Sequence, residues 1–220
     1  CRSVDVPPPP AMRVFIAGML RSQPSITAMA RKFLDLTFTP SVVKTQLQFG
    51  HRQGSRLAEN RGALELEDDT LSEPEIQFIV ARDSFYMATV NEEGWPYLQH
   101  RGGPPGFIKV IDSKTLAYAD FGGNQQLLSM GNLQGNSRTS VFLMDYAQQR
   151  RLKLLARSEF VDARSATGST AELLQAVSDP HYSARIERIV LLHVVAYDWN
   201  CPQHITPRYT ESEWRAASTQ

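Results

Sequence analysis

A cation and two glycines interrupt a strand-like run near the middle of the sequence. The stretch YLQHRGGPPGFI covers residues 97–108, and its Arg101 is followed directly by Gly102 and Gly103. Arginine presents a planar fork of donors that suits phosphate oxygens, and glycine has no Cβ to keep a ligand away from backbone N–H groups. The stretch is therefore either a plain connecting loop or one wall of a site for an anionic ligand.

Two other segments supply pieces of such a site. FGGNQQ (121–126) places glycines ahead of a helix that we expect from Asn124 to Leu133, and a helix N-terminus attracts anions. RRLK (150–153) adds basic residues at the start of a strand. Each piece alone is typical of a turn, a loop or a solvated face, whereas the three together favour an anion site.

The composition excludes several classes of function. The chain of 220 residues has 23 Lys plus Arg and 23 Asp plus Glu, and this balance argues against a general nucleic-acid binder. No apolar run approaches the roughly 18 residues of a membrane helix, so we expect no membrane partner. Two cysteines, Cys1 and Cys201, form no disulfide framework and fit a reducing, cytoplasmic compartment.

Familiar catalytic and metal-binding motifs are missing from the sequence. It has no GxGxxG after a strand, no GxxxxGK[ST], no GxSxG, no HExxH and no CxxC. Cys201 and His204 form a C-x-x-H pair, but a metal site needs a second pair at suitable spacing. We therefore expect no metal, and we interpret His193, inside the apolar run LLHVVAY, as a structural histidine.

Alternating apolar residues between short turns predict that the middle and end of the chain are mostly β-structure. Short turns join antiparallel neighbours, and helices do not alternate regularly with the strands. The prediction is a mainly β (α+β) fold, an antiparallel closed or split β-barrel of six to seven strands with peripheral helices. The expected strands cover residues 84–90, 95–101, 107–111, 115–120, 138–145, 151–161 and 187–199.

Helices are expected after Pro40, after the cap residue Ser72, and within residues 165–180. The strand alternation also predicts which side chains fill the barrel. These core residues are Phe85, Met87, Val110, Leu116, Val141, Leu143 and Leu154.

Four regions follow from these patterns. Residues 1–28 are basic and contain a proline run at 7–10, so we expect a disordered or targeting-like extension, with organellar import as one reading. Residues 29–81 form a helical or irregular segment that packs on the barrel. Residues 82–210 form the barrel domain, and 211–220 form a C-terminal tail.

The order of these elements resembles the FMN-binding split barrel of the pyridoxamine 5'-phosphate oxidase superfamily. The motifs HRGGPPGF, GNL, LMDY, RRLKLLAR and DWNCPQHITPR resemble its flavin-nucleotide-binding subfamily, and FLDLTFTPSV resembles that subfamily's usual start. The resemblance covers about residues 82–163 and 187–208. The C-terminal segment does not match the Arg and His pattern of the true oxidase, so the resemblance stops short of that enzyme.

The resemblance implies a homodimer with two FMN molecules, each in a groove at the subunit interface. By position, strand residues implied near the flavin and the ribityl phosphate are Gln99, His100, Arg101 and Gly102. The fourth strand would run beside the ring with Tyr118, Ala119 and Asp120. Phosphate positions fall on Asn124 and Gln125, while Arg151 and Lys153 would reach in from the basic strand, with a reach across the dimer as one arrangement. The oxidases usually carry Arg-Lys where this chain has Asn124-Gln125, which removes two positive charges.

Three functions stay open from the sequence. The first is an FMN-dependent oxidoreductase of a small-molecule substrate, in which the flavin carries the chemistry and the protein orients it. Its weak candidates for proton transfer are His100 and Tyr118. The second is a non-catalytic flavin-binding or redox-stress protein. The third is a split barrel that binds another anionic cofactor, such as heme or a deazaflavin.

Overall fold

One antiparallel sheet of seven strands organises the protein. The computed structural model describes residues 31–51, 67–123, 125–199 and 202–218. The strand order is β2-β1-β5-β6-β7-β4-β3, so β2 and β3 lie at the two edges and the sheet is not closed. The strands are β1 (Ser84–Val90), β2 (Pro96–Gly102), β3 (Lys109–Asp112), β4 (Thr115–Phe121), β5 (Arg138–Asp145), β6 (Arg150–Asp162) and β7 (Ile186–Trp199).

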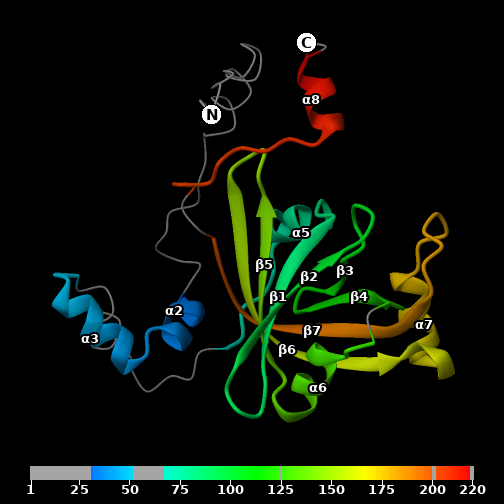
Figure 1. Cartoon of the computed structure of the whole chain (residues 1–220), viewed down its shortest axis with the longest axis horizontal. Coiled ribbons are helices and arrows are strands. Elements are labelled where there is room, and N and C mark those ends of the chain that lie inside the picture. The colour runs from blue at the N-terminus through cyan, green and yellow to red at the C-terminus, as the bar shows by residue number, and fades with distance from the viewer. Residues whose placement is uncertain (1–30, 52–66, 124, 200–201, 219–220) are drawn as a thin grey trace.

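The sheet twists strongly along its length. In Figure 1, β1 and β5 run steeply up the view, whereas β4 and β7 cross it almost horizontally. Such a twist lets one continuous sheet wrap around a core. The α+β split barrel expected from the sequence is confirmed, and of the closed and split forms the structure takes the split one.

Six α-helices surround the sheet in the described part of the chain. They are α2 (Arg31–Thr37), α3 (Pro40–Gln48), α5 (Glu73–Val80), α6 (Leu128–Gly135), α7 (Ser169–Val177) and α8 (Glu211–Ser218). The predicted start signals are confirmed for two of them. Pro40 occupies the first turn of α3, and Ser72 forms a capping box with Glu75 at the start of α5.

Two of these helices, α2 and α8, were not expected from the sequence. Helix α2 packs beside β7 and buries Phe33, so tertiary contact holds this short segment in place. Helix α8 lies in the region expected to be a tail, and its start carries a capping box in which Glu213 accepts hydrogen bonds from the Thr210 N–H and hydroxyl. The expected extension over residues 1–28 lies outside the described residues.

The main core lies on one face of the sheet, and its side chains alternate along the strands as predicted. Six of the seven predicted core side chains are buried, and Val110 is partly buried against them. Aromatic rings pack at its centre, where Phe85 stacks on Phe107 at 5.8 Å between ring centroids and meets Tyr118 edge-on at 5.2 Å. A second, smaller cluster lies on the opposite face of β4 and β7 beneath α7. We call the core side of the sheet its inner face and the opposite side its outer face.

Candidate functional site

Three charged side chains meet where β2, β4 and β7 run close together. Arg101 Nη1 lies 2.7 Å from Asp120 Oδ1, and Arg188 Nε lies 2.8 Å from Asp120 Oδ2. Asp120 and Arg188 are direct cross-strand partners in the β4–β7 ladder. All three side chains are mostly buried, so this charge-assisted network is shielded from solvent and rigid.

The network continues into the glycine loop that follows β4. Arg188 Nη1 lies 3.0 Å from Glu187 Oε2, and the Gly122 N–H donates to the carbonyl of Arg185 at 2.8 Å. A Cβ added at Gly122 would lie 3.1 Å from Glu187 Oε1, so glycine suits this close approach. Two arginines and two carboxylates thus form a cluster, the Arg101–Asp120–Arg188–Glu187 network, whose formal charge is zero.

Helix α6 contacts β1 and β2 next to this network. The Ser129 hydroxyl donates to Gln99 Oε1 at 3.0 Å, and Asn132 Nδ2 donates to Thr89 Oγ1 at 2.9 Å. Gln99 and Arg101 share one face of β2, as the sequence predicted, since the intermediate burial of residues 97, 99 and 101 alternates with exposed neighbours. The helix therefore holds Gln99 on the same face of β2 as Arg101.

Two buried guanidinium atoms in the described part of the chain lack a hydrogen-bond partner, Arg101 Nε and Arg151 Nε. A buried donor without an acceptor costs about 1–3 kcal/mol. An acceptor brought by a ligand, or by a second chain, would remove that cost. Arg101 is therefore held in place by Asp120 and keeps a donor unused.

The predicted residues Arg151 and Lys153 lie on the other face of the sheet. Leu152 lies between the two cations and Leu154 follows Lys153, and both leucines point into the core. Because side chains alternate along a strand, the two cations point outward. Lys153 Nζ pairs with Asp198 at 2.7 Å and lies 4.5 Å from the centroid of the Phe33 ring. Within one chain, the structure does not bring these cations to Arg101.

The two candidates for proton transfer also occupy different places. Tyr118 is 1% exposed, its hydroxyl donates to Met87 Sδ at 3.5 Å, and burial raises the pKa of this phenol. A core residue of this kind does not fit the role of a general acid or base. His100 is exposed on the outer face, with its ring edge-on to Tyr86 at 5.6 Å between centroids. Ala119 is buried in the small cluster beneath α7.

The glycines after Arg101 serve packing more than ligand approach. A Cβ at Gly103 would lie 2.7 Å from Phe107 Cβ, and the Gly103 N–H donates to the Asp83 carbonyl at 2.9 Å. Gly102 is similarly close to His100, with 3.1 Å between its added Cβ and the ring Cε1. The expectation that these glycines leave N–H groups free for a ligand is therefore wrong for Gly103.

The helix expected from Asn124 begins later. Helix α6 starts at Leu128, because Leu127 before it takes a left-handed conformation with φ 53°. Gln125 is exposed in the loop, and Asn124 lies outside the described residues. The expected phosphate position at a helix N-terminus directly after the glycines is thus replaced by a short loop.

Arg188 is the site residue that sequence reasoning missed. It sits 68 residues after Asp120, and only the register of β4 against β7 brings the two together. An arginine near the start of a long apolar strand was the available signal. Without the pairing it carries no information about its partner.

The fold and the charged network define an open antiparallel split barrel with a mostly buried charge cluster at one end. The sequence matches the family model described as pyridoxamine 5'-phosphate oxidase over residues 73–196, more than half of the chain. The protein therefore belongs to the pyridoxamine 5'-phosphate oxidase family. No curated protein sequence matches the chain.

Several solved structures are similar to the chain at low identity. HupZ from Group A Streptococcus is 13% identical with a TM-score of 0.44, covering 63% of this chain and 100% of that one. An FMN-binding protein from Syntrophomonas wolfei is 11% identical with a TM-score of 0.40, covering 57% and 86%. The General Stress Protein 26 from Bacillus anthracis is 12% identical with a TM-score of 0.37, covering 56% and 89%.

The described residues contain neither a helix that could span a membrane nor a cluster of metal ligands. None of the helices over those residues has the length and apolar character needed to cross a membrane. The same residues contain no group of three or more His, Cys, Asp or Glu side chains placed to hold a metal ion.

Proposed function

We propose that this protein binds FMN between two copies of the chain and acts as an FMN-dependent oxidoreductase on a small-molecule substrate. The observation that carries the proposal is Arg101, which Asp120 holds in place while its buried Nε lacks an acceptor. Membership of the pyridoxamine 5'-phosphate oxidase family supports a flavin as the cofactor.

The charge of the network decides which part of FMN it suits. Asp120 and Glu187 already compensate Arg101 and Arg188, so a phosphate dianion would gain little net attraction there. A neutral acceptor such as a carbonyl of the pyrimidine edge of the flavin fits the unused Arg101 donor. Gln99, fixed by Ser129, offers a second polar group beside it.

The phosphate needs a different cation, and the outer face of the sheet carries candidates. Arg151 has an unpartnered buried Nε, and Lys153 adjoins it on β6. Because these cations point away from Arg101 within one chain, we assign them to the FMN held by the second copy. This is the reach across the dimer that the family resemblance left open.

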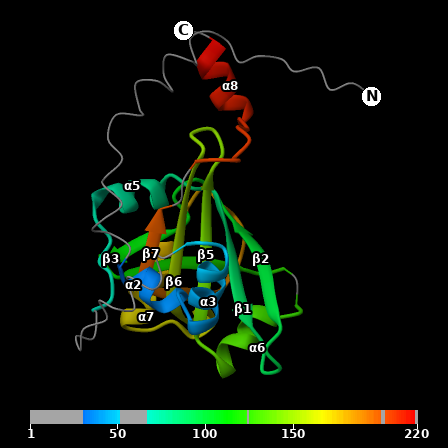
Figure 2. The same cartoon turned by 90° about the vertical axis from the view of Figure 1, so that its left-hand side faces the viewer.

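Apolar groups on the outer side of the molecule support a second copy. Leu98 is 64% exposed on the outer face of β2, and Phe49 at the end of α3 is 75% exposed. Helix α3 has no buried residue, and Figure 2 shows α2 and α3 in front of β5 and β6. Burial of this surface between two copies would remove apolar groups from water, and an obligate interface of this kind covers about 2,000 Å² or more.

The residues of this chain would bind and orient the cofactor. When bound, FMN supplies the electron or hydride transfer. Arg101 would donate to the pyrimidine edge, a position where a cation stabilises negative charge on the ring. Asp120 would hold the guanidinium, and the burial of the network would exclude water from that edge.

Purified protein tests the proposal directly. We expect a yellow protein that releases FMN on denaturation, identified by mass spectrometry, and that sediments as a dimer. Bleaching by NADH or NADPH under anaerobic conditions, with turnover on an added acceptor, would support the oxidoreductase. Bound FMN without turnover would instead support a flavin-binding protein, and release of heme or a deazaflavin would overturn the FMN assignment.

A further inference from the structure

A polar pocket of about 470 Å³ lies at the opposite end of β1 from Arg101. Phe85, opposite Arg101 in the β1–β2 ladder, and Val90, which lines the pocket, are five residues apart on β1. At about 3.3 Å per strand residue, this separates the two regions by about 17 Å. The pocket is therefore a region distinct from the Arg101–Asp120–Arg188–Glu187 network.

The pocket forms where two strands part. The pairing of β1 with β5 ends at Ala88 and Ser140. Beyond it, the turn after β1 and the connection from α6 to β5 enclose the space, with Glu92 on one segment and Asn136 on the other. The side chain of Asn136 is held at the pocket, because its Oδ1 accepts a hydrogen bond from the Arg138 N–H at 3.1 Å.

Two arginines line one side of this pocket. Arg138 and Arg157 are direct cross-strand partners on β5 and β6, and both are exposed. Over the residues that the structure describes, neither guanidinium makes an ion pair or a hydrogen bond. Like charges directly opposite each other destabilise a sheet. An anion between them would turn this repulsion into two charge-assisted contacts.

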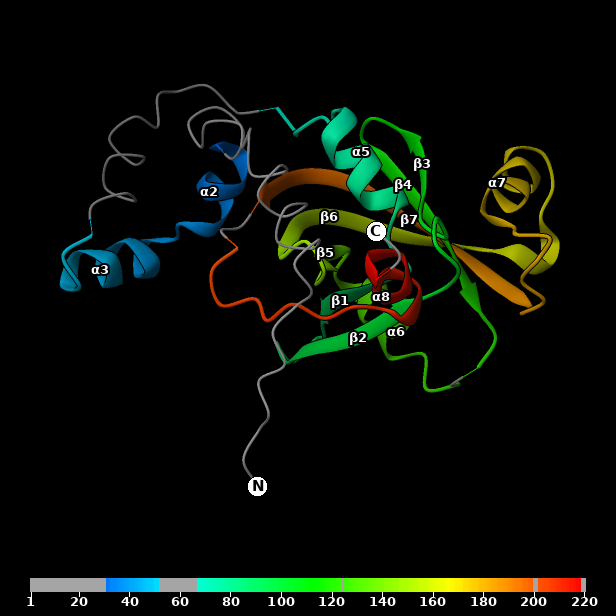
Figure 3. The same cartoon turned by 90° about the horizontal axis from the view of Figure 1, so that it is seen from above.

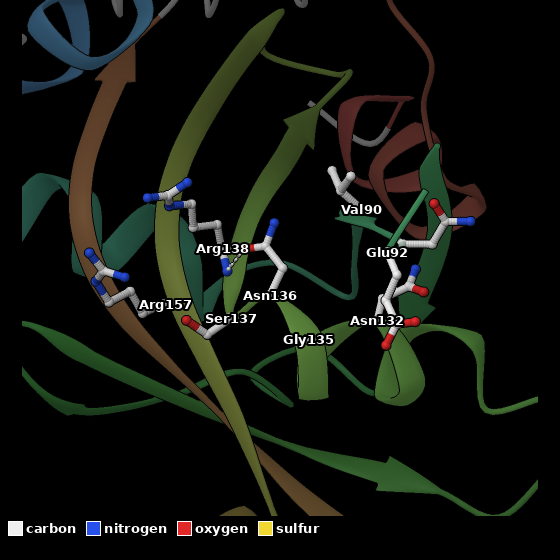
Figure 4. Close-up of a pocket in the computed structure, with 9 residues that line it drawn as sticks. Val90, Glu92, Asn132, Gly135, Asn136, Ser137, Arg138 and Arg157 are labelled. Carbon is white, nitrogen blue, oxygen red and sulfur yellow. Dashed lines mark hydrogen bonds between the residues drawn. The ribbon is translucent and has the colours of Figure 1, made fainter. Parts of the chain in front are cut away.

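The opposite side of the pocket carries negative charge. Figure 4 shows Arg138 and Arg157 on one side and Glu92 with Asn132 on the other. Glu92 is the acid among the lining residues, and its carboxylate lies near Gly135, the last residue of α6. Backbone carbonyls at a helix C-terminus carry partial negative charge, so this side favours a cationic donor.

We propose that the pocket binds a small zwitterion, a phosphate monoester that also carries a primary amine. The dianionic phosphate lies between Arg138 and Arg157, whose planar donor forks match phosphate oxygens. The ammonium lies at Glu92 and the end of α6. A pocket of this volume suits a small molecule, and the proposal does not depend on FMN binding at the other end of β1.

O-Phosphoethanolamine is the probe, measured by isothermal titration calorimetry on the purified full chain. Ethyl phosphate is its matched partner, because it keeps the monoester and lacks the amine. We expect phosphoethanolamine to bind several-fold more tightly than ethyl phosphate. Equal affinities would overturn the assignment of the ammonium, and no heat with either compound at 10-fold excess over millimolar protein would overturn the site.

Variants locate the binding to the two sides of the pocket. Arg157→Gln and Arg138→Gln should each weaken both probes about tenfold or more, the loss expected for a charge-assisted contact. Glu92→Gln should weaken phosphoethanolamine and leave ethyl phosphate unchanged. Lys44→Gln, an exposed cation on α3, is the control and should change neither. Unchanged binding in both arginine variants, with thermal unfolding showing intact folds, would overturn the proposal.

A competition separates this site from the proposed cofactor site. Phosphoethanolamine should bind with the same affinity in the presence of saturating FMN. Displacement of the probe by FMN would overturn the proposal, since the arginines would then hold the cofactor's phosphate. Loss of FMN binding in Arg101→Ala with phosphoethanolamine binding retained would support two separate sites.

Discussion

The Arg101–Asp120–Arg188–Glu187 network and the Arg138–Arg157 pair use the same side chain in opposite ways. In the network, two carboxylates compensate two guanidiniums, and the side chains of Arg101 and Asp120 are mostly buried. In the pair, two exposed guanidiniums face each other across β5 and β6 without a compensating contact in the described structure. Arginines paired with carboxylates form a rigid cluster of zero formal charge. Arginines without such partners form a positively charged surface that can attract an anion.

The largest expected effect comes from removing the carboxylate that unites the network. Asp120→Asn leaves Arg101 and Arg188 without their shared counter-charge, and breaking a buried pair costs about 3–5 kcal/mol of unfolding free energy. Urea unfolding measures the loss. Asp162→Asn breaks the exposed pair with Arg164 and should cost far less. Equal losses in the two variants would show that the network is not a structural frame.

The next effect distinguishes the ligand role of Arg101 from its structural role. In Arg101→Ala, Asp120 keeps Arg188 as a partner, so we expect a folded protein with unchanged far-UV circular dichroism. FMN affinity, from flavin fluorescence quenching, should fall roughly ten- to hundredfold, as for a lost charge-assisted bond.

Arg101→Lys sharpens the same measurement, because an ammonium cannot both pair with Asp120 and reproduce a planar, two-pronged donor. It should recover only part of the lost FMN affinity. Affinity within about threefold of the parent in Arg101→Ala, a loss under about 0.7 kcal/mol, would mean that Arg101 belongs to the frame alone.

At the Arg138–Arg157 pair, we expect a substitution to change the free energy of unfolding by less and in the opposite direction. In ligand-free protein, Arg157→Thr removes the cross-strand repulsion with Arg138 and introduces a residue that favours strands. The free energy of unfolding should rise by about 0.2–1 kcal/mol. A clear destabilisation would show that Arg157 has a stabilising partner and would remove the contrast between the two regions.

The smallest effect is the response to salt. Exposed like charges are screened at high ionic strength, whereas the buried network is screened much less. Between 0.05 M and 0.5 M NaCl, the stability gap between Arg157→Thr and the parent should shrink. The difference in unfolding free energy between Asp120→Asn and the parent should stay constant. If this difference shrinks as much as the one for Arg157→Thr, the network is exposed to solvent.

The sequence predicted those parts of the molecule that local patterns determine. The strands over residues 84–90 and 138–145 have the predicted bounds, because their alternating side chains and flanking turns are local signals. The capping residue Ser72 was found in the same way. The start of α8 carries an equally local signal in Thr210 and Glu213, although residues 211–220 were predicted to be a tail.

The site was predicted only in part, because its geometry depends on long-range register. Gln99 and Arg101 were named from their shared strand face and Asp120 from the family resemblance, and the structure brings them to one end of the barrel. Arg188 and the Arg138–Arg157 pair depend on which residues face each other across strands, and no single segment carries that information. For Tyr118 the strand was predicted correctly, but its side chain lies in the core and not at the site.

The pairing of β4 with β7 also sets the order in which the molecule can be assembled. The β1–β2 hairpin closes through neighbouring residues, but Asp120 must wait for a partner 68 positions later, and such distant pairings form slowly. Figure 3 shows β7 running between β6 and β4, where it joins the two parts of the sheet. During synthesis, a chain that has not yet emerged past Arg188 therefore holds Arg101 and Asp120 without the strand that fixes them. The charged network at this end of the barrel is therefore complete only after the last strand has been made.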